Sequence, residues 1–350
     1  MEARRPSPTP EFDRRPEAER PSGALFKRVA VCVDGSEIAD AIVHLAAEVA
    51  EAFSASLTIL RVVEPYPGLD ETPIDPLDWS LRQREAQADL DRMRQLAGPD
   101  RVAVESELLQ GAAAEQICEW TRLHQIDLTV LGSHGERGRS EWSLASTARK
   151  LVDGVSGSVL LVPLDGIEAD GLCRTYGRVV VPLDGSSSSE SALPMATRFA
   201  TAHDAELLLV HVPPGPVLTR VGPPTAEDLD LEARVVERNQ RVAVAYLDQI
   251  RARLQESGVR VRVVVATAGD VRTRLARFAR REDAGLVVLS AYGQRGPRDI
   301  PCGSVAGYLL THATAPLLVV RERPRHVLRR YAAEAAKRAP HARPPAQVVS

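Results

Sequence analysis

Apolar and polar positions follow two periods along the chain, one typical of strands and one typical of helices. Short apolar runs predict five buried strands, at 28–33, 56–63, 101–109, 127–131 and 158–162. Helical periods fall between them, near 37–52, 80–97, 112–124 and 144–155. Five further runs predict strands near 178–183, 205–212, 259–266, 285–290 and 316–320. Strands joined by crossover helices predict an α/β fold with two tandem doubly wound, mainly parallel, five-stranded sheets.

The second set of strands repeats the first, which indicates a duplicated domain. RVAVCVDGSE at residue 28 aligns with RVVVPLDGSS at residue 178, a separation of 150 residues that becomes 158 beyond the second helix. We expect domains at 25–163 and 177–321, joined by a linker at 164–176. A disordered tail rich in proline and arginine is expected at 1–24, and a basic tail at 322–350.

The longest helix is predicted in the second copy, near 227–257. Seven residues recur there at helical spacing and predict one buried stripe: Leu231, Val235, Asn239, Val242, Tyr246, Ile250 and Leu254.

Composition limits the function classes. With a net charge of -3 and a pI near 6.3, the chain has no overall basic field, so any contact with a polyanion has to be local and no specific nucleic-acid binding is expected. The four cysteines (Cys32, Cys118, Cys173 and Cys302) have no metal-ligand spacing. No apolar run approaches the roughly 20 residues that span a bilayer, and the N-terminus lacks an apolar signal core. We expect a cytoplasmic protein.

Two glycine-containing loops carry the candidate chemistry. The stretch GSHGERGRSEWSLAST at 132–147 and its copy SAYGQRGPRDIPCGSV at 290–305 each follow a strand and lead into a helix. A helix start presents unpaired N–H groups and a positive dipole end, which suit phosphate oxygens. A turn followed by an N-capped helix is the alternative explanation. Recurrence in both copies, together with an aspartate after each first strand (Asp34 and Asp184), favours the phosphate site.

These residues resemble the universal stress protein family, whose signature is Gly, two residues, Gly, nine residues, Gly, and then Ser or Thr. The signature falls on Gly132, Gly135, Ala145 and Ser146, and again on Ser290, Gly293, Gly303 and Ser304. The resemblance implies a tandem, Rossmann-like universal stress protein in which adenine and ribose are held at Asp34, Val62 and Leu131, or at Asp184, Val212 and Leu289. The triphosphate of ATP, with or without Mg²⁺, is then expected along the loop and at the helix start, where Thr147 and Val305 also lie.

Departures from the signature distinguish the two copies. Ala145 replaces the third glycine of the first copy, and its methyl group would occupy phosphate space if the backbone must approach the ligand closely. Ser290 replaces the first glycine of the second copy, at a strand end where its side chain can point away. Pro297 and Pro301 stiffen the second loop and remove N–H donors, but the helix start is intact. The second copy is therefore the favoured phosphate site.

No catalytic set is found in the sequence. His134 lies in the first loop, where a histidine can contact phosphate or assist proton transfer, but a lone loop histidine is more often a hydrogen-bonded bystander. Ser186 to Ser189 are expected to cap a helix. The sequences VDGSE and LDGSS differ from the SGGxDS pattern of related pyrophosphatase-type enzymes, and no GxxxxGK[ST] motif is present. We expect a non-enzymatic stress-response protein that binds ATP or a related adenine nucleotide in one or both domains. A nucleotide-free dimerisation scaffold and a weak ATP hydrolase are the alternatives.

The last strand of each copy, at 159–163 and 317–321, is apolar and predicted to lie at a sheet edge. An unpaired edge strand recruits another strand, and the resemblance to universal stress proteins implies that this edge mediates dimerisation. The two copies are therefore expected to pair within one chain as a pseudo-dimer, with a homodimer as the alternative assembly.

Overall fold

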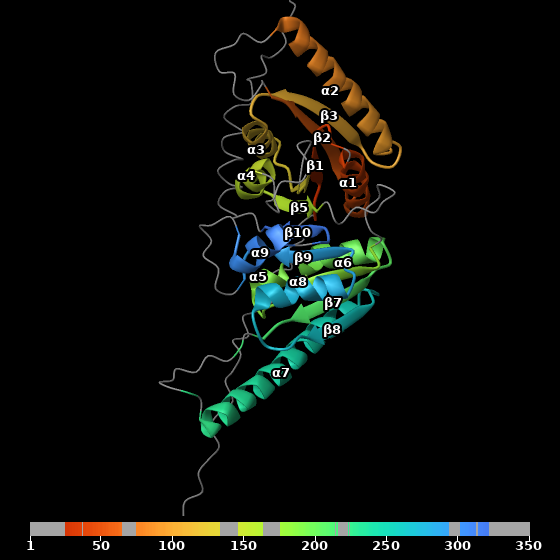
Figure 1. Cartoon of the computed structure of the whole chain (residues 1–350). Helices are drawn as coiled ribbons and strands as arrows, with labels where there is room; N and C mark the ends of the chain where they lie inside the picture. The colour runs from red at the N-terminus through yellow and green to blue at the C-terminus, as the bar shows by residue number, and fades with distance from the viewer. Residues whose placement is uncertain are drawn as a thin grey trace, which may run out of the picture.

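The computed structural model describes residues 25–36, 38–64, 75–133, 146–163, 176–213, 215, 223, 225–293, 302–312 and 314–321 (Figure 1). The first half contains β1 (Arg28–Val33), α1 (Ala39–Phe53), β2 (Ser56–Val63), α2 (Pro76–Leu96), β3 (Val104–Gln110), α3 (Ala113–Leu123), β4 (Leu128–Gly132), α4 (Ser146–Gly154) and β5 (Ser158–Val162). The second half contains β6 (Arg178–Pro182), α5 (Ser187–Glu190), α6 (Leu193–Ala202), β7 (Glu206–His211), α7 (Ala226–Gln255), β8 (Val261–Val265), α8 (Val271–Arg281), β9 (Leu286–Ser290), α9 (Ser304–His312) and β10 (Leu317–Val320).

The strands form one ten-stranded sheet in the order β3-β2-β1-β4-β5-β10-β9-β6-β7-β8. Each half is the predicted five-stranded parallel sheet, with its first strand flanked by its second and fourth strands. The two halves join where β5 pairs with β10 in the antiparallel sense. The predicted α/β doubly wound fold and the pairing of the two copies within one chain are both confirmed.

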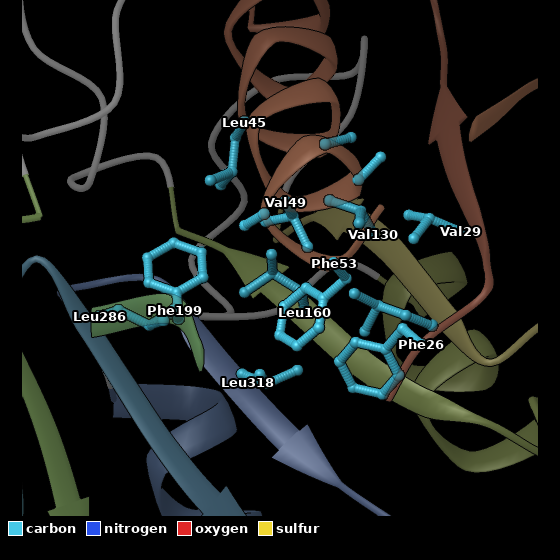
Figure 2. Close-up of a cluster of buried hydrophobic side chains, with 14 of the residues drawn as sticks. Phe26, Val29, Leu45, Val49, Phe53, Val130, Leu160, Phe199, Leu286 and Leu318 are labelled. Atoms are coloured by element: carbon cyan, nitrogen blue, oxygen red, sulfur yellow. The ribbon is translucent and has the colours of Figure 1, made fainter. Parts of the chain in front are cut away.

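Helices cover both faces of the sheet, and two apolar layers continue across the junction between the halves. Leu160 and Leu318 lie on one face, with α1 and α6, whereas Leu161 and Leu317 lie on the other, with α4 and α9. Figure 2 shows the first of these layers, in which Leu160 and Leu318 lie among side chains from both halves. All the residues of β5 and β10 are buried. Burial on both faces explains why these strands are continuously apolar in the sequence.

Two arginines of the second half hold helix ends of the first half. Arg321, directly after β10, donates from its guanidinium to the carbonyl oxygens of Val155 at 2.7 Å and Gly157 at 3.3 Å, and also to that of Val152. Arg198 donates from Nε to the carbonyl oxygen of Ala52 at 2.6 Å, at the end of α1. A cation at a helix C-terminus satisfies carbonyls that have no partner within the helix. These contacts tie α4 and α1 to the second half.

The prediction of a single buried stripe along α7 is partly wrong. Ile250 is buried, but Leu231 is 48% exposed and Val242 is 55% exposed. The fully buried residues of the helix are Ala243, Leu247 and Ile250, and the predicted Tyr246 and Leu254 are partly buried against the same core. At 30 residues α7 is about 45 Å long, whereas β8 beside it has five residues, so the N-terminal part of the helix extends beyond the sheet (Figure 1). Helical spacing alone does not reveal how far the sheet reaches.

We predict that Arg321→Ala lowers the free energy of unfolding by about 2 to 3 kcal/mol, because the substitution removes charge-assisted hydrogen bonds from half-buried carbonyls. Urea denaturation followed by circular dichroism measures this change. Arg101→Ala is the matched control, since the ion pair of Arg101 with Glu51 is exposed and contributes about 0 to 1 kcal/mol. Equal effects of the two substitutions would contradict a role for Arg321 in joining the halves.

Candidate functional site

The candidate site of each half lies at the carboxyl edge of its parallel strands. In the first half, β1 pairs with β2 on one side and with β4 on the other, and chain connections run away from β1 in both directions. A doubly wound sheet binds ligands at such a point of reversal. Because β5 and β10 are antiparallel, the carboxyl edges of the two halves face opposite ways. The molecule therefore has two separate candidate sites on opposite edges of the sheet.

In the first half, the strand register brings the expected adenosine residues together. Val33 is opposite Arg61 and Cys32 is opposite Leu131, so Asp34, Val62 and Leu131 end three neighbouring strands. Asp34 is half-buried, and its Oδ1 accepts a hydrogen bond from the backbone N–H of Ser36 at 3.0 Å. The turn after β1 thus fixes the direction of the carboxylate.

The first glycine loop begins where β4 ends. Gly132 pairs with Val162 of β5, and the N–H of Ser133 donates to the carbonyl oxygen of Val162 at 2.8 Å. Gly135, His134 and Ala145 lie outside the described residues. The structure resumes at α4, whose first residues, Ser146 and Thr147, are exposed. The two flanks of the predicted phosphate loop are therefore present at the carboxyl edge.

In the second half, a serine-rich turn holds Asp184 after β6. Oδ1 of Asp184 accepts hydrogen bonds from the N–H of Ser186 at 2.9 Å and from its hydroxyl at 2.6 Å. The N–H of Asp184 donates to the hydroxyl of Ser189 at 3.3 Å. Ser186 also accepts from the N–H of Ser189 at 3.1 Å, which confirms the predicted capping role of these serines. One carboxylate oxygen of Asp184 is engaged by the turn, which aims the other across the strand ends.

That other oxygen meets the second glycine loop. Oδ2 of Asp184 lies 2.5 Å from the position that a Cβ atom on Gly293 would occupy. A real Cβ cannot approach an oxygen so closely, so Gly293 leaves the space that the Asp184 carboxylate fills. The first-strand aspartate and the glycine loop, which are 109 residues apart in the sequence, are thus in direct contact.

Gly303 marks the start of α9 and behaves differently. Its N–H donates to the carbonyl oxygen of Ala291 at 2.7 Å, and a Cβ added to it would lie 3.4 Å from that same oxygen. This distance is an ordinary contact, and the φ angle of Gly303 is outside the left-handed region. Folding therefore gives no strong reason for glycine here. Ser304 is exposed at the first position of α9, and Val305 follows it half-buried.

Ser290 occupies the place of the missing first glycine and turns back on its own backbone. Its hydroxyl donates to the carbonyl oxygen of Tyr292 and accepts from the N–H of Tyr292 at 3.2 Å. The serine therefore replaces glycine by closing a local turn. Leu289 precedes Ser290 in β9, Val212 directly follows β7, and both side chains are buried. Pro297 and Pro301 lie outside the described residues.

The described residues offer little for covalent or metal chemistry. Burial raises the pKa of the Cys32 thiol to about 12, with a smaller contribution from Cys118, and burial also raises the pKa values of Cys118 and Cys302. These thiols are protonated at neutral pH and are poor nucleophiles. In the part of the chain that the structure describes, no group of three His, Cys, Asp or Glu side chains is placed to hold a metal ion. Within the same ranges, no helix combines the length and apolar character needed to cross a membrane.

The sequence did not reveal the Asp184–Gly293 contact or the two arginines that hold helix ends. The repeat gave one usable signal, because Asp184 and Gly293 are equivalent to Asp34 and Gly135 of the first copy. The repeat gives no such signal for the two arginines, because the first copy has Glu48 and Pro163 at the positions equivalent to Arg198 and Arg321.

Known proteins share this architecture and parts of this sequence. The crystal structure of a universal stress protein from Archaeoglobus fulgidus has the same fold, with a TM-score of 0.56 and 16% identity over 84% of this chain and 98% of that chain. A universal stress protein of Mycolicibacterium smegmatis is 26% identical over 84% of this chain and 97% of its own length, and one of Methanocaldococcus jannaschii is 28% identical over 39% of this chain and 82% of its own length. The model of the universal stress protein family matches residues 25–163 and again residues 175–321. The chain therefore belongs to the universal stress protein family, with two tandem family domains.

Proposed function

We propose that this protein binds ATP or a related adenine nucleotide at the carboxyl edge of its second domain, in the cytoplasm, as a non-enzymatic component of a stress response. The observation that carries the proposal is the meeting of Asp184, Gly293 and the start of α9 at one strand edge. A carboxylate suits ribose hydroxyls, and an open helix start suits phosphates. Leu289 and Val212 flank this edge and offer backbone groups and apolar surface for adenine.

Different residues of the proposed site are expected to hold the ribose and the phosphates. Oδ1 of Asp184 is engaged by Ser186, whereas Oδ2 lies beside Gly293, which is where we place the ribose hydroxyl. The first N–H groups of α9, beginning at Ser304, supply donors for phosphate oxygens, as do those at Ser146 and Thr147 of α4 in the first domain. Any Mg²⁺ would accompany the phosphates, since it keeps several waters and needs few protein ligands.

The second domain is favoured because its helix start can admit a ligand closely. Gly303 has neither a positive φ nor a crowded Cβ position, so positive φ is excluded as the reason for glycine and close approach by a ligand remains. At the equivalent position of the first domain, Ala145 adds a methyl group. We therefore propose unequal sites, with Asp34, Val62, Leu131, Gly132 and Gly135 forming the weaker one.

Two other functions are kept as alternatives. A nucleotide-free scaffold agrees with the extensive pairing of the halves through β5 and β10. A weak ATP hydrolase needs a group that activates water, and the sequence contains no recognisable catalytic set for this task. His211, at the end of β7, has its Nδ1 2.7 Å from the carbonyl oxygen of Leu183, the residue before Asp184.

We predict that millimolar ATP with Mg²⁺ raises the thermal unfolding temperature. A ligand present at 100 times its Kd stabilises the folded state by about 2.7 kcal/mol. Differential scanning calorimetry measures the shift, and phosphate release measured in parallel is expected to equal the blank. A shift accompanied by hydrolysis would favour the hydrolase. The absence of a shift, together with no nucleotide released on denaturation, would favour the scaffold.

Gly303→Ala is predicted to weaken ATP binding by roughly ten- to hundredfold without changing stability, since the added methyl group hinders a charge-assisted phosphate contact but lies at an ordinary contact distance, 3.4 Å, from the carbonyl oxygen of Ala291. Ala145→Gly, the equivalent position in the first domain, should leave affinity unchanged or strengthen it. Isothermal titration calorimetry of both variants measures the two effects. If Gly303→Ala binds ATP as tightly as the wild type, the phosphates do not bind at the start of α9.

Gly293→Ala is predicted to destabilise the protein itself, because its Cβ would lie 2.5 Å from Oδ2 of Asp184. Shortening the opposing side chain in the double variant Gly293→Ala/Asp184→Ala should restore part of the lost stability, which urea denaturation can measure as a coupling energy of about 0.5 to 3 kcal/mol. Gly303→Ala serves as the glycine control. If the effects of the Gly293 and Asp184 substitutions are simply additive, the contact between them has no energetic importance.

A further inference from the structure

Helix α8 carries a row of arginines that its counterpart in the first domain lacks. Both helices have 11 residues, and equivalent positions are 158 residues apart. The exposed positions of α8 are Arg272, Arg274, Arg277, Arg280 and Arg281, and the matching positions of α3 are Ala114, Gln116, Glu119, Arg122 and Leu123. With no acidic residue, α8 has a charge of +5, whereas α3, which also contains Glu115, has a charge of -1. The fold does not require this charge, because α3 occupies the same place without it.

The arginines form one outward surface. Leu275 and Phe278 are buried against the sheet, which directs the intervening side chains to solvent, and α8 lies on the face of the lower half that is turned to the viewer in Figure 1. Arg274, Arg277 and Arg280 follow each other at intervals of three residues, so they extend over about 9 Å of helix. We call these three residues the α8 arginine row.

Local carboxylates form ion pairs with arginines at the ends of α8 but not with the α8 arginine row. Arg272 pairs with Asp270 at 3.2 Å, and Arg281 lies 3.7 Å from Glu282. Among the described residues, no carboxylate oxygen lies within the 4.0 Å of an ion pair from any member of the row. The exposed arginines of α7 differ, since Arg234 and Arg241 pair with acids one turn away on the same helix.

Such a surface suits a polymer of phosphates. Arginine forms charge-assisted, bidentate hydrogen bonds with phosphate oxygens, and several in a row match the repeated charge of a nucleic-acid backbone. A membrane is a poorer match, because a helix that lies on a lipid surface needs an exposed apolar face and the large apolar residues of α8 point inward. The net charge of -3 gives the chain as a whole no general attraction for polyanions, so the contact is expected at a local basic surface such as this helix.

We propose that the α8 arginine row is a sequence-independent contact surface for the phosphate backbone of a nucleic acid. This contact surface is on the outer face of α8. The proposed nucleotide site is at the strand ends, where Asp184 and Gly293 meet the start of α9. Because the row contacts phosphates and not bases, it gives affinity without sequence preference. This inference does not depend on the proposed nucleotide binding.

Fluorescence anisotropy with a labelled DNA duplex of arbitrary sequence tests the proposal on the full chain. The logarithm of the binding constant is measured against the logarithm of salt concentration for the wild type and for the triple variant Arg274→Gln/Arg277→Gln/Arg280→Gln. Each lost phosphate contact lowers the magnitude of the slope by about 0.9, so we expect a reduction of about 2.7 and weaker binding at every salt concentration. The basic segment 322–350 is the same in both proteins, so the difference in slope reports α8.

The matched control is Arg234→Gln/Arg238→Gln/Arg241→Gln on α7, which removes the same charge from another exposed helix. This control is expected to leave the slope unchanged. The proposal is overturned if the wild type does not bind the duplex at low salt, if the α8 variant keeps the wild-type slope, or if the α7 variant loses as much. Binding to vesicles of anionic phospholipid without binding to the duplex would assign the surface to lipid and would also overturn it.

Discussion

The antiparallel pairing of β5 with β10 is the interaction on which the rest of the structure depends. A five-stranded parallel sheet of this kind ends in an edge strand whose backbone groups are unpaired and whose side chains are apolar on both faces. Each half supplies the missing neighbour of the other, so that Leu160 and Leu318 enter one core layer while Leu161 and Leu317 enter the second. The junction between the domains is therefore as apolar and as continuous as the interior of either domain.

The direction of that pairing also places the two candidate sites on opposite edges of the sheet. Since the strands of the two halves run in opposite directions, their carboxyl edges cannot share one cleft. Each domain must complete its own site from its own strand ends, and each site is free to change without altering the other. Duplication thus explains how one copy can contain Ala145 and the other Ser290 at different points of the same signature. The same freedom extends to the surface, where α8 has become strongly basic and α3 has not.

Much of the fold could be predicted from the sequence, because the central strands are buried on both faces and are therefore marked by mainly apolar runs. The bounds of β1, β2 and β5 agree with those runs residue for residue. Prediction failed where the environment is set by distant parts of the chain. Val242 follows the helical spacing of a core residue, yet it is exposed because α7 is longer than the strand beside it and extends past the sheet. Arg321 resembles the first residue of a basic tail, but its guanidinium holds the end of α4, 169 positions earlier in the sequence at Val152.

The candidate site shows the same limit at the level of single glycines. Gly293 and Gly303 belong to one signature, but the structure gives them different physical reasons. Gly293 makes room for the carboxylate of Asp184, so its presence reflects packing as well as any ligand. A Cβ on Gly303 would make only an ordinary contact, 3.4 Å from the carbonyl oxygen of Ala291, and its φ is outside the left-handed region, so neither packing nor backbone conformation requires glycine. A glycine that folding does not need is more informative about a ligand than one that folding does need. For this reason the start of α9, more than the glycine loop as a whole, carries the argument for phosphate binding.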